Sequence, residues 1–150
     1  MTISQPRHIV CAVRGGIESR DTVTRAIDLA LETGVGLTFF HVLDAEFLEY
    51  ATIGPLSVVY QELTEMGKFA MMILRDRAQR RGVERVDYVV REGNIPKQLR
   101  LFAIETHADV MVMGRPATGE SRNVFKENEF DQFTAELELQ GGLKIIAVPE

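Results

Sequence analysis

Two short segments carry the residue types best suited to holding an anion. Arg14-Gly15-Gly16 follows an apolar run near the start of the sequence, and Gly114-Arg115-Pro116 follows another apolar run much later. Glycine lets backbone N–H groups come close to a phosphate or a carboxylate, and arginine supplies positive charge. If the fold brings these two segments together, they form a site for an anionic ligand.

An acidic cluster competes for the same arginines. Glu127, Glu129 and Asp131 lie at the start of a predicted helix, where the helix dipole and free N–H groups would otherwise attract an anion. Arg14 and Arg115 can therefore either hold an external anion or pair with these carboxylates. We expect the pairing, an arginine–carboxylate clasp, and keep the external anion as the alternative.

The side chains that most often perform catalysis are dispersed along the sequence. No two histidines have the spacing of metal ligands, and no serine has a neighbouring base. A Walker-type Gly-Lys-Ser/Thr and a Gly-x-Ser-x-Gly elbow are both absent. We expect no catalytic residue and no metal site; a small hydrolase or transferase, such as a weak nucleotide hydrolase, is the least favoured alternative. The side chains considered are His8, His41, His107, Ser19, Ser57 and Ser121.

Composition narrows the class of protein. The formal net charge of -5 argues against a general nucleic-acid binder, which needs clustered lysine and arginine. No stretch approaches the roughly 20 apolar residues that span a bilayer, and the N-terminus lacks an apolar signal core. The single cysteine, Cys11, lies within an apolar run and is expected to be a buried, inert thiol. We therefore expect a cytoplasmic protein that binds neither nucleic acid nor membrane.

The order of apolar and helix-period segments predicts repeated β–α units. Helical sequence separates the strands, and the last helix presents Phe130, Phe133 and Leu137 on one face. We expect one domain over residues 1–150: a three-layer α/β sandwich with a five-stranded parallel sheet and helices on both faces. Ligands on such sheets bind beyond the carboxyl ends of the strands, so the loop that begins at Gly114 is the expected functional region. The predicted strands are residues 8–13, 35–42, 84–91, 109–113 and 143–148.

The longest predicted helix runs over about residues 57–82. Leu63, Met66, Ala70 and Ile73 recur at helical spacing with Val59, and we expect them to form the buried face. The same helix is rich in methionine, which can indicate a groove for a partner. We interpret its methionines as gap-filling core residues instead, namely Met66, Met71 and Met72.

One block of the sequence resembles the universal stress protein family. It consists of Arg91-Glu92-Gly93-Asn94-Ile95-Pro96, a helix, and Ala108-Asp109-Val110-Met111-Val112-Met113-Gly114. Ile9-Val10-Cys11-Ala12-Val13, Phe40-His41-Val42 and Ile145-Ile146-Ala147-Val148-Pro149 match as well. The resemblance covers essentially the whole chain. It implies the strand order 3-2-1-4-5, a Rossmann-like fold and a role in stress response.

The resemblance also implies where the sequence departs from members that bind ATP. Those members carry an aspartate after the first strand, where this sequence has Arg14, and a Gly-x-x-Gly motif, where Ala117 replaces the second glycine. Their later Gly-Ser or Gly-Thr pair corresponds here to Asp131 and Gln132. We therefore expect no cofactor and a degraded ATP-binding motif, with ATP or AMP as the alternative ligand. Residues that would line such a nucleotide or anion site are Val13, Arg14, Gly15, Val42, Met113, Gly114, Arg115 and Gly119.

The last predicted strand lies at the edge of the sheet in the implied order. An apolar edge has unpaired backbone groups and must be paired or protected. The family pairs this strand antiparallel with its copy, so we expect a homodimer that also contacts an unknown protein partner. The alternative function is a variant regulatory module that binds an adenine nucleotide between strands 1 and 4. The expected dimer contacts are Leu143, Ile145, Ile146 and Val148.

Overall fold

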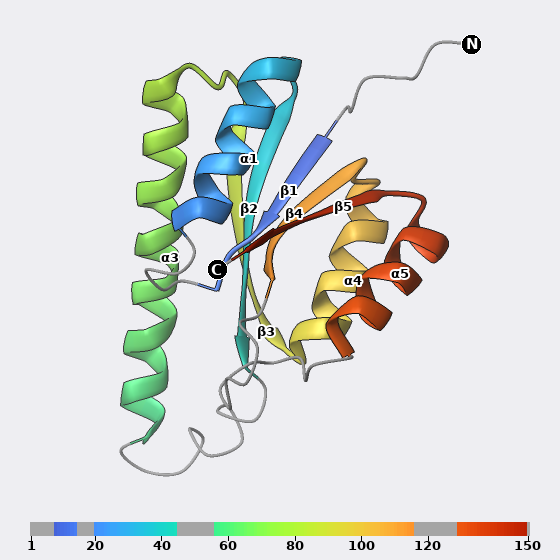
Figure 1. Cartoon of the computed structure of the whole chain (residues 1–150). Helices are drawn as coiled ribbons and strands as arrows, with labels where there is room; N and C mark the ends of the chain where they lie inside the picture. The colour runs from blue at the N-terminus through green and yellow to red at the C-terminus, as the bar shows by residue number, and fades with distance from the viewer. Residues whose placement is uncertain (1–7, 15–19, 45–55, 116–128, 150) are drawn as a thin grey trace, which may run out of the picture.

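A computed structural model of the chain describes residues 8–14, 20–44, 56–115 and 129–149 (Figure 1). Gly15, Gly119 and Glu127, which belong to the predicted site and the acidic cluster, lie outside these ranges. The elements are β1 (His8–Ala12), α1 (Arg20–Thr33), β2 (Gly36–Asp44), α3 (Leu56–Arg81), β3 (Val86–Gly93), α4 (Ile95–Thr106), β4 (Val110–Arg115), α5 (Glu129–Gly141) and β5 (Lys144–Pro149).

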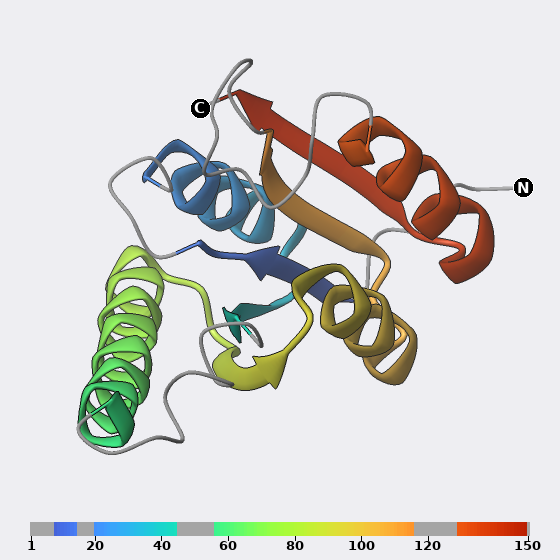
Figure 2. The ribbon, with the colours of Figure 1, turned by 90° about the horizontal axis from the view of Figure 1, so that it is seen from below.

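The five strands form one parallel sheet in the order β3-β2-β1-β4-β5. Helices α1 and α3 cover one face and α4 and α5 cover the other, as Figures 1 and 2 show. The predicted three-layer α/β sandwich and its strand order are confirmed. The order reverses between β1 and β4, because the chain places β2 and β3 on one side of β1 and then crosses over to place β4 and β5 on the other side.

Alternation along β1 divides the core into two halves. Ile9 and Cys11 are fully buried on the side of α1 and α3, whereas Val10 is fully buried on the side of α4 and α5. A central parallel strand is apolar on both faces for this reason. Burial raises the pKa of the Cys11 thiol, so the prediction of a buried, unreactive cysteine is confirmed.

Hydrogen bonds connect neighbouring strands at the end of the sheet where the parallel strands begin, which we call the amino edge; the opposite end, where the strands finish, is the carboxyl edge. The His8 backbone N–H donates to Asp109 Oδ2 at 2.9 Å, and the Asp109 N–H donates to the His8 carbonyl at 3.0 Å. The His8 ring contacts Thr38 through Nε2 and Oγ1, 3.0 Å apart. Burial lowers the pKa of His8, against the opposing effect of the Asp109 carboxylate.

Local signals set the ends of the helices. Asn94 caps α4, since its side-chain oxygen accepts the Lys97 N–H at 3.0 Å, and Pro96 lies in the first turn. Gly34 ends α1 with a φ of 71°, a conformation that glycine adopts at little cost. In the part of the chain that the structure describes, no helix is long and apolar enough to cross a membrane.

The predicted buried face of α3 is wrong except at Ala70, which packs against the core. Leu63, Met66 and Ile73 are exposed, by 38%, 64% and 50%. The face against the sheet instead contains Met71 and Ala78, which are buried, with Tyr60, Thr64, Gly67 and Leu74 half-buried. Apolar residues occupy two faces of this helix, and Gly67 allows one of them to approach the sheet closely. The core interpretation of the methionines therefore holds only for Met71, since Met66 and Met72 are exposed.

Candidate functional site

The carboxyl ends of β1 and β4 hold most of the predicted site residues. Val13, Met113 and Gly114 are buried there, and the Val13 N–H donates to the Phe40 carbonyl at 2.8 Å. Arg14 and Arg115 are exposed just beyond the buried backbone. The fold thus presents the two arginines at the same edge of the sheet, where the strand order reverses.

Arg115 forms the clasp that the sequence predicts. Its Nη2 donates to both carboxylate oxygens of Asp131, at 3.0 Å and 3.3 Å. The guanidinium carbon also lies 5.6 Å from the centre of the Phe130 ring. Asp131 stands in the first turn of α5 together with Glu129, so carboxylates occupy the end of the helix that would favour an external anion.

A separate hollow of about 460 Å³ lies between α3 and the carboxyl ends of β1 and β2. It includes Arg14 and Val42 from the predicted site, but not Met113, Gly114 or Arg115. The predicted site is therefore divided into a clasped region at β4 and an open hollow at β2. The hollow is lined by Arg14, His41, Val42, Leu43, Tyr60, Leu63, Met66, Gly67, Ala70, Met71 and Ile95.

Two polar residues of this hollow were missed by the sequence interpretation. His41 Nδ1 lies 2.8 Å from the Val13 carbonyl, so Nδ1 must carry a proton and Nε2 accepts hydrogen bonds when the ring is neutral. Tyr60 Oη is buried and has no hydrogen-bond partner among the residues that the structure describes. A buried hydroxyl without a partner is costly in a folded protein, so it indicates a place where a ligand group can bond.

Gly67 explains how α3 comes so near to His41. A Cβ at this position would lie 3.3 Å from His41 Cδ2, a tight contact with a ring that Val13 already holds. A glycine inside a helix, with a histidine at the end of a predicted strand, is the only sequence signal for this hollow. The signal has meaning only once α3 is placed against β2.

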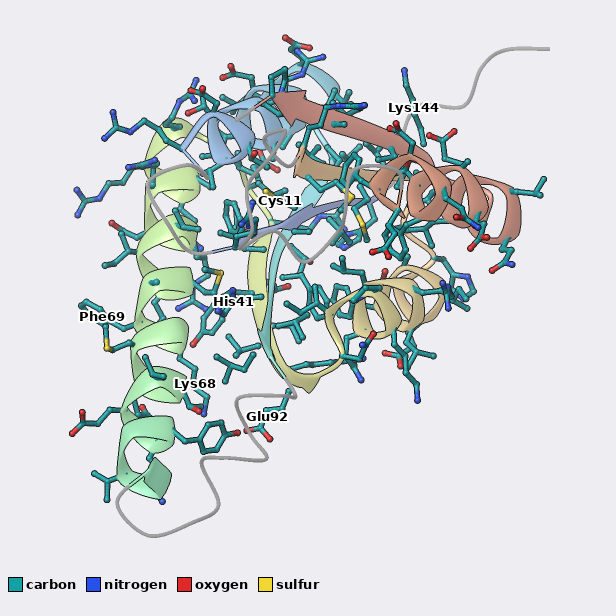
Figure 3. The ribbon with its side chains drawn as sticks, turned by 60° about the horizontal axis from the view of Figure 1, so that its bottom comes forward. Cys11, His41, Lys68, Phe69, Glu92 and Lys144 are labelled. Carbon is teal, nitrogen blue, oxygen red and sulfur yellow. The ribbon has the colours of Figure 1, made fainter. Side chains whose placement is uncertain are left out.

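A second hollow of about 410 Å³ continues from Leu43 toward the outer edge of the sheet. It is lined by Leu43, Thr64, Lys68, Val90, Arg91 and Glu92. Figure 3 shows His41, Lys68 and Glu92 along the strip between α3 and the sheet. Arg91 already has partners here, because its Nη2 donates to Glu105 Oε2 at 2.6 Å and its guanidinium lies over Phe102.

The described residues contain no group of three or more His, Cys, Asp or Glu side chains arranged to hold a metal ion. The polar side chains described at the carboxyl ends of the strands can offer a ligand hydrogen bonds and charge. They are Arg14 near the hollow, Arg115 in the clasp, the His41 imidazole and the Tyr60 phenol.

The profile of the universal stress protein family matches residues 6–126. The chain belongs to the universal stress protein family. The resemblance seen in the sequence is thus confirmed. The matched region ends before α5, the helix that carries Asp131. No curated protein sequence matches the chain.

Solved structures of the family share the fold. Universal stress protein UspA from Lactobacillus plantarum is 17% identical, with a TM-score of 0.74 over 97% of this chain and 99% of that one. A universal stress protein in complex with cAMP is 17% identical (TM-score 0.66; 97% and 98% covered). The Archaeoglobus fulgidus protein in complex with dAMP is 16% identical (TM-score 0.61; 98% and 99% covered).

Proposed function

We propose that this member of the universal stress protein family is a non-catalytic stress-response protein that acts through protein contacts and has lost strong ATP binding. The observation that carries this proposal is the clasp between Arg115 and Asp131. Arg115 is used internally, and with Glu129 and Asp131 it leaves a net negative charge at the start of α5.

Electrostatics support the loss of triphosphate binding. Two like charges about 4 Å apart cost roughly 4 kcal/mol at an effective dielectric of 20 and about 1 kcal/mol in bulk water. Because Asp131 is exposed and paired with Arg115, we expect a cost near the lower value, set against the roughly 8 kcal/mol of a micromolar complex. The clasp is exposed, so it contributes little stability by itself. Its effect is on the ligand, because it places a carboxylate where a phosphate would need donors.

The test is nucleotide content and nucleotide response of the purified chain. We expect mass spectrometry of the denatured protein to find no bound ATP, ADP or AMP. Millimolar ATP with Mg²⁺ should leave the melting temperature unchanged. A shift of several degrees that persists at matched ionic strength would contradict the proposal.

The proposed protein contacts include a homodimer through β5. Ile145, Ile146 and Val148 are partly exposed, whereas Leu143 is buried in the core and drops out of the predicted interface. The Lys144 N–H donates to Asp109 O on the β4 side at 2.9 Å. Alternation then turns the N–H groups of residues 145 and 147 outward. The Ile145 N–H already meets Glu138 Oε1 at 3.3 Å, so Glu138 partly covers this edge.

Light scattering tests the β5 dimer. Ala147→Pro removes an outward N–H without removing a bond to β4, so it should convert a β5 dimer to a folded monomer. Ile146→Pro is unsuitable because it would break the sheet itself. A mass that is unchanged in Ala147→Pro would rule out pairing through this strand.

A second candidate function follows from the hollow at α3. Tyr60 Oη has no hydrogen-bond partner in the described part of the chain, and Val42, Leu43 and Met71 supply apolar walls. A volume of about 460 Å³ lies within the usual range for small-molecule sites. This arrangement favours a neutral planar group such as a nucleobase, and solved relatives hold cAMP and dAMP. The chain would then be a regulatory module for a nucleoside monophosphate.

Tyr60→Phe tests this second candidate. Removing a buried hydroxyl without a partner should raise the free energy of unfolding by about 1 kcal/mol. If the hydroxyl bonds a ligand, the same variant should lower AMP affinity measured by calorimetry. Wild-type protein that binds no AMP at millimolar concentration would exclude the module.

A further inference from the structure

The outward face of α3 carries an apolar stripe that no described residue covers. Met66, Phe69, Met72 and Ile73 expose 64%, 63%, 43% and 50% of their surface. Figure 3 shows Phe69 pointing away from the sheet. If a whole large side chain has a surface of about 150–250 Å², these four side chains together expose on the order of 400 Å². An apolar patch of this size on a monomer is often an interaction site.

Charges of opposite sign stand at the two ends of this stripe. Glu62 lies one turn before Met66, and Arg77 lies one turn after Ile73. Both side chains are exposed, and neither forms an ion pair with a described residue. Their neighbours Glu65 and Arg80 carry the same signs, although both are paired within the helix, Glu65 with Lys68 at 4.0 Å and Arg80 with Asp76 at 2.9 Å.

We propose that this face docks against the same face of a second copy, with the two α3 helices antiparallel. A two-fold axis between the helices then brings Glu62 against Arg77 of the partner subunit, and Arg77 against Glu62 of the partner subunit. A parallel arrangement would oppose like charges at both ends. The stripe is therefore complementary to itself in charge as well as in apolar pattern, which is what an isologous interface requires.

The α3 interface is independent of the proposed β5 dimer. α3 packs beside β2 and β3, while β5 forms the opposite edge of the sheet, as Figure 2 shows. The apolar area is below the roughly 800 Å² per partner of a standard interface, so we expect association in the micromolar range. Residues that line the hollow are left unchanged in the tests, so ligand binding and docking stay separable.

Sedimentation velocity over micromolar concentrations tests the apolar contact. Phe69→Gln with Ile73→Gln should weaken self-association at least tenfold while circular dichroism shows a folded chain. Ile104→Gln is the matched control, because Ile104 on α4 is exposed to 49% against 50% for Ile73. The proposal would be overturned if the α3 double variant and Ile104→Gln had equal effects. It would also be overturned if the α3 double variant associated as strongly as the wild type. Ala147→Pro reports separately on β5.

A charge exchange tests the antiparallel arrangement. Glu62→Arg and Arg77→Glu should each weaken association alone, since each opposes like charges. Mixing the two variant chains should restore it, and so should both substitutions in one chain. Single variants that associate like the wild type, with a mixture that associates more tightly than the wild type, would indicate a parallel pair and overturn the antiparallel arrangement. Association that is insensitive to every exchange would show that the surface does not dock as proposed.

Discussion

At the amino edge of the sheet, hydrogen bonds join His8 to Thr38 and Asp109, whereas the carboxyl edge has a buried hydroxyl, that of Tyr60, with no hydrogen-bond partner among the described residues. His8, Thr38 and Asp109 form a closed set of contacts between β1, β2 and the start of β4. Tyr60 and the hollow around it lie at the other end of the same strands. The same sheet thus has one edge built for stability and one with capacity left for binding.

The carboxyl edge is itself uneven. Near β4, Arg115 and Asp131 form an ion pair, whereas near β2 there is an open, largely apolar hollow. We propose that the first region disfavours a phosphate and that the second binds a neutral planar group. Substitutions at each edge should therefore separate stability from binding.

The largest expected effect is at the amino edge. Asp109→Ala removes the acceptor of the His8 N–H and should lower the free energy of unfolding by about 2 kcal/mol. Asp109→Asn keeps an acceptor oxygen and should lose less. Urea denaturation measures both. Nucleotide response should be the same in the two variants as in the wild type; a change in it would mean that the edges are not independent.

The next effect concerns the clasp. Asp131→Gly with Gln132→Ser removes the carboxylate and supplies the residue types of the family's ATP-binding members. We expect ATP affinity to rise about tenfold, which corresponds to about 1.4 kcal/mol. Calorimetry with ATP and Mg²⁺ measures it. Glu136→Gln makes the same charge change farther along α5 and should have a smaller effect; an equal gain would mean that net charge, and not position, controls binding.

Local sequence signals predicted most of the fold. The cap at Asn94, the stop at Gly34 and the apolar run 109–113 act over a few residues, so the helices and strands lie close to where they were expected. The strand order came from the resemblance to the family. The Arg115–Asp131 clasp was also predicted, because opposite charges and helix position were visible in the sequence.

Features that depend on how elements pack were not predictable in this way. Apolar residues lie on two faces of α3, and periodicity alone does not show which face is buried. The prediction therefore placed Met66 and Ile73 in the core, whereas Met71 and Ala78 are the buried residues. Leu143 was expected at an edge, but the turn at Gly142 directs it into the core. The hollow with Tyr60 exists only because α3 approaches β2, which no local pattern shows.

The smallest effect tests the amino edge by pH. Burial holds the pKa of His8 below its ordinary value of 6.5, so the folded state prefers the neutral ring. The unfolded chain binds more protons just below that value, and the stability that is present above it is lost as the pH falls through the unfolded pKa toward the folded one.

His8→Gln should remove this loss. The measurement is the difference in the free energy of unfolding between the two proteins, followed from neutral to mildly acidic pH. A difference that stays constant, or one in which acid favours the wild type, would show that His8 is not held neutral and that the amino edge is less tightly closed than its hydrogen bonds indicate.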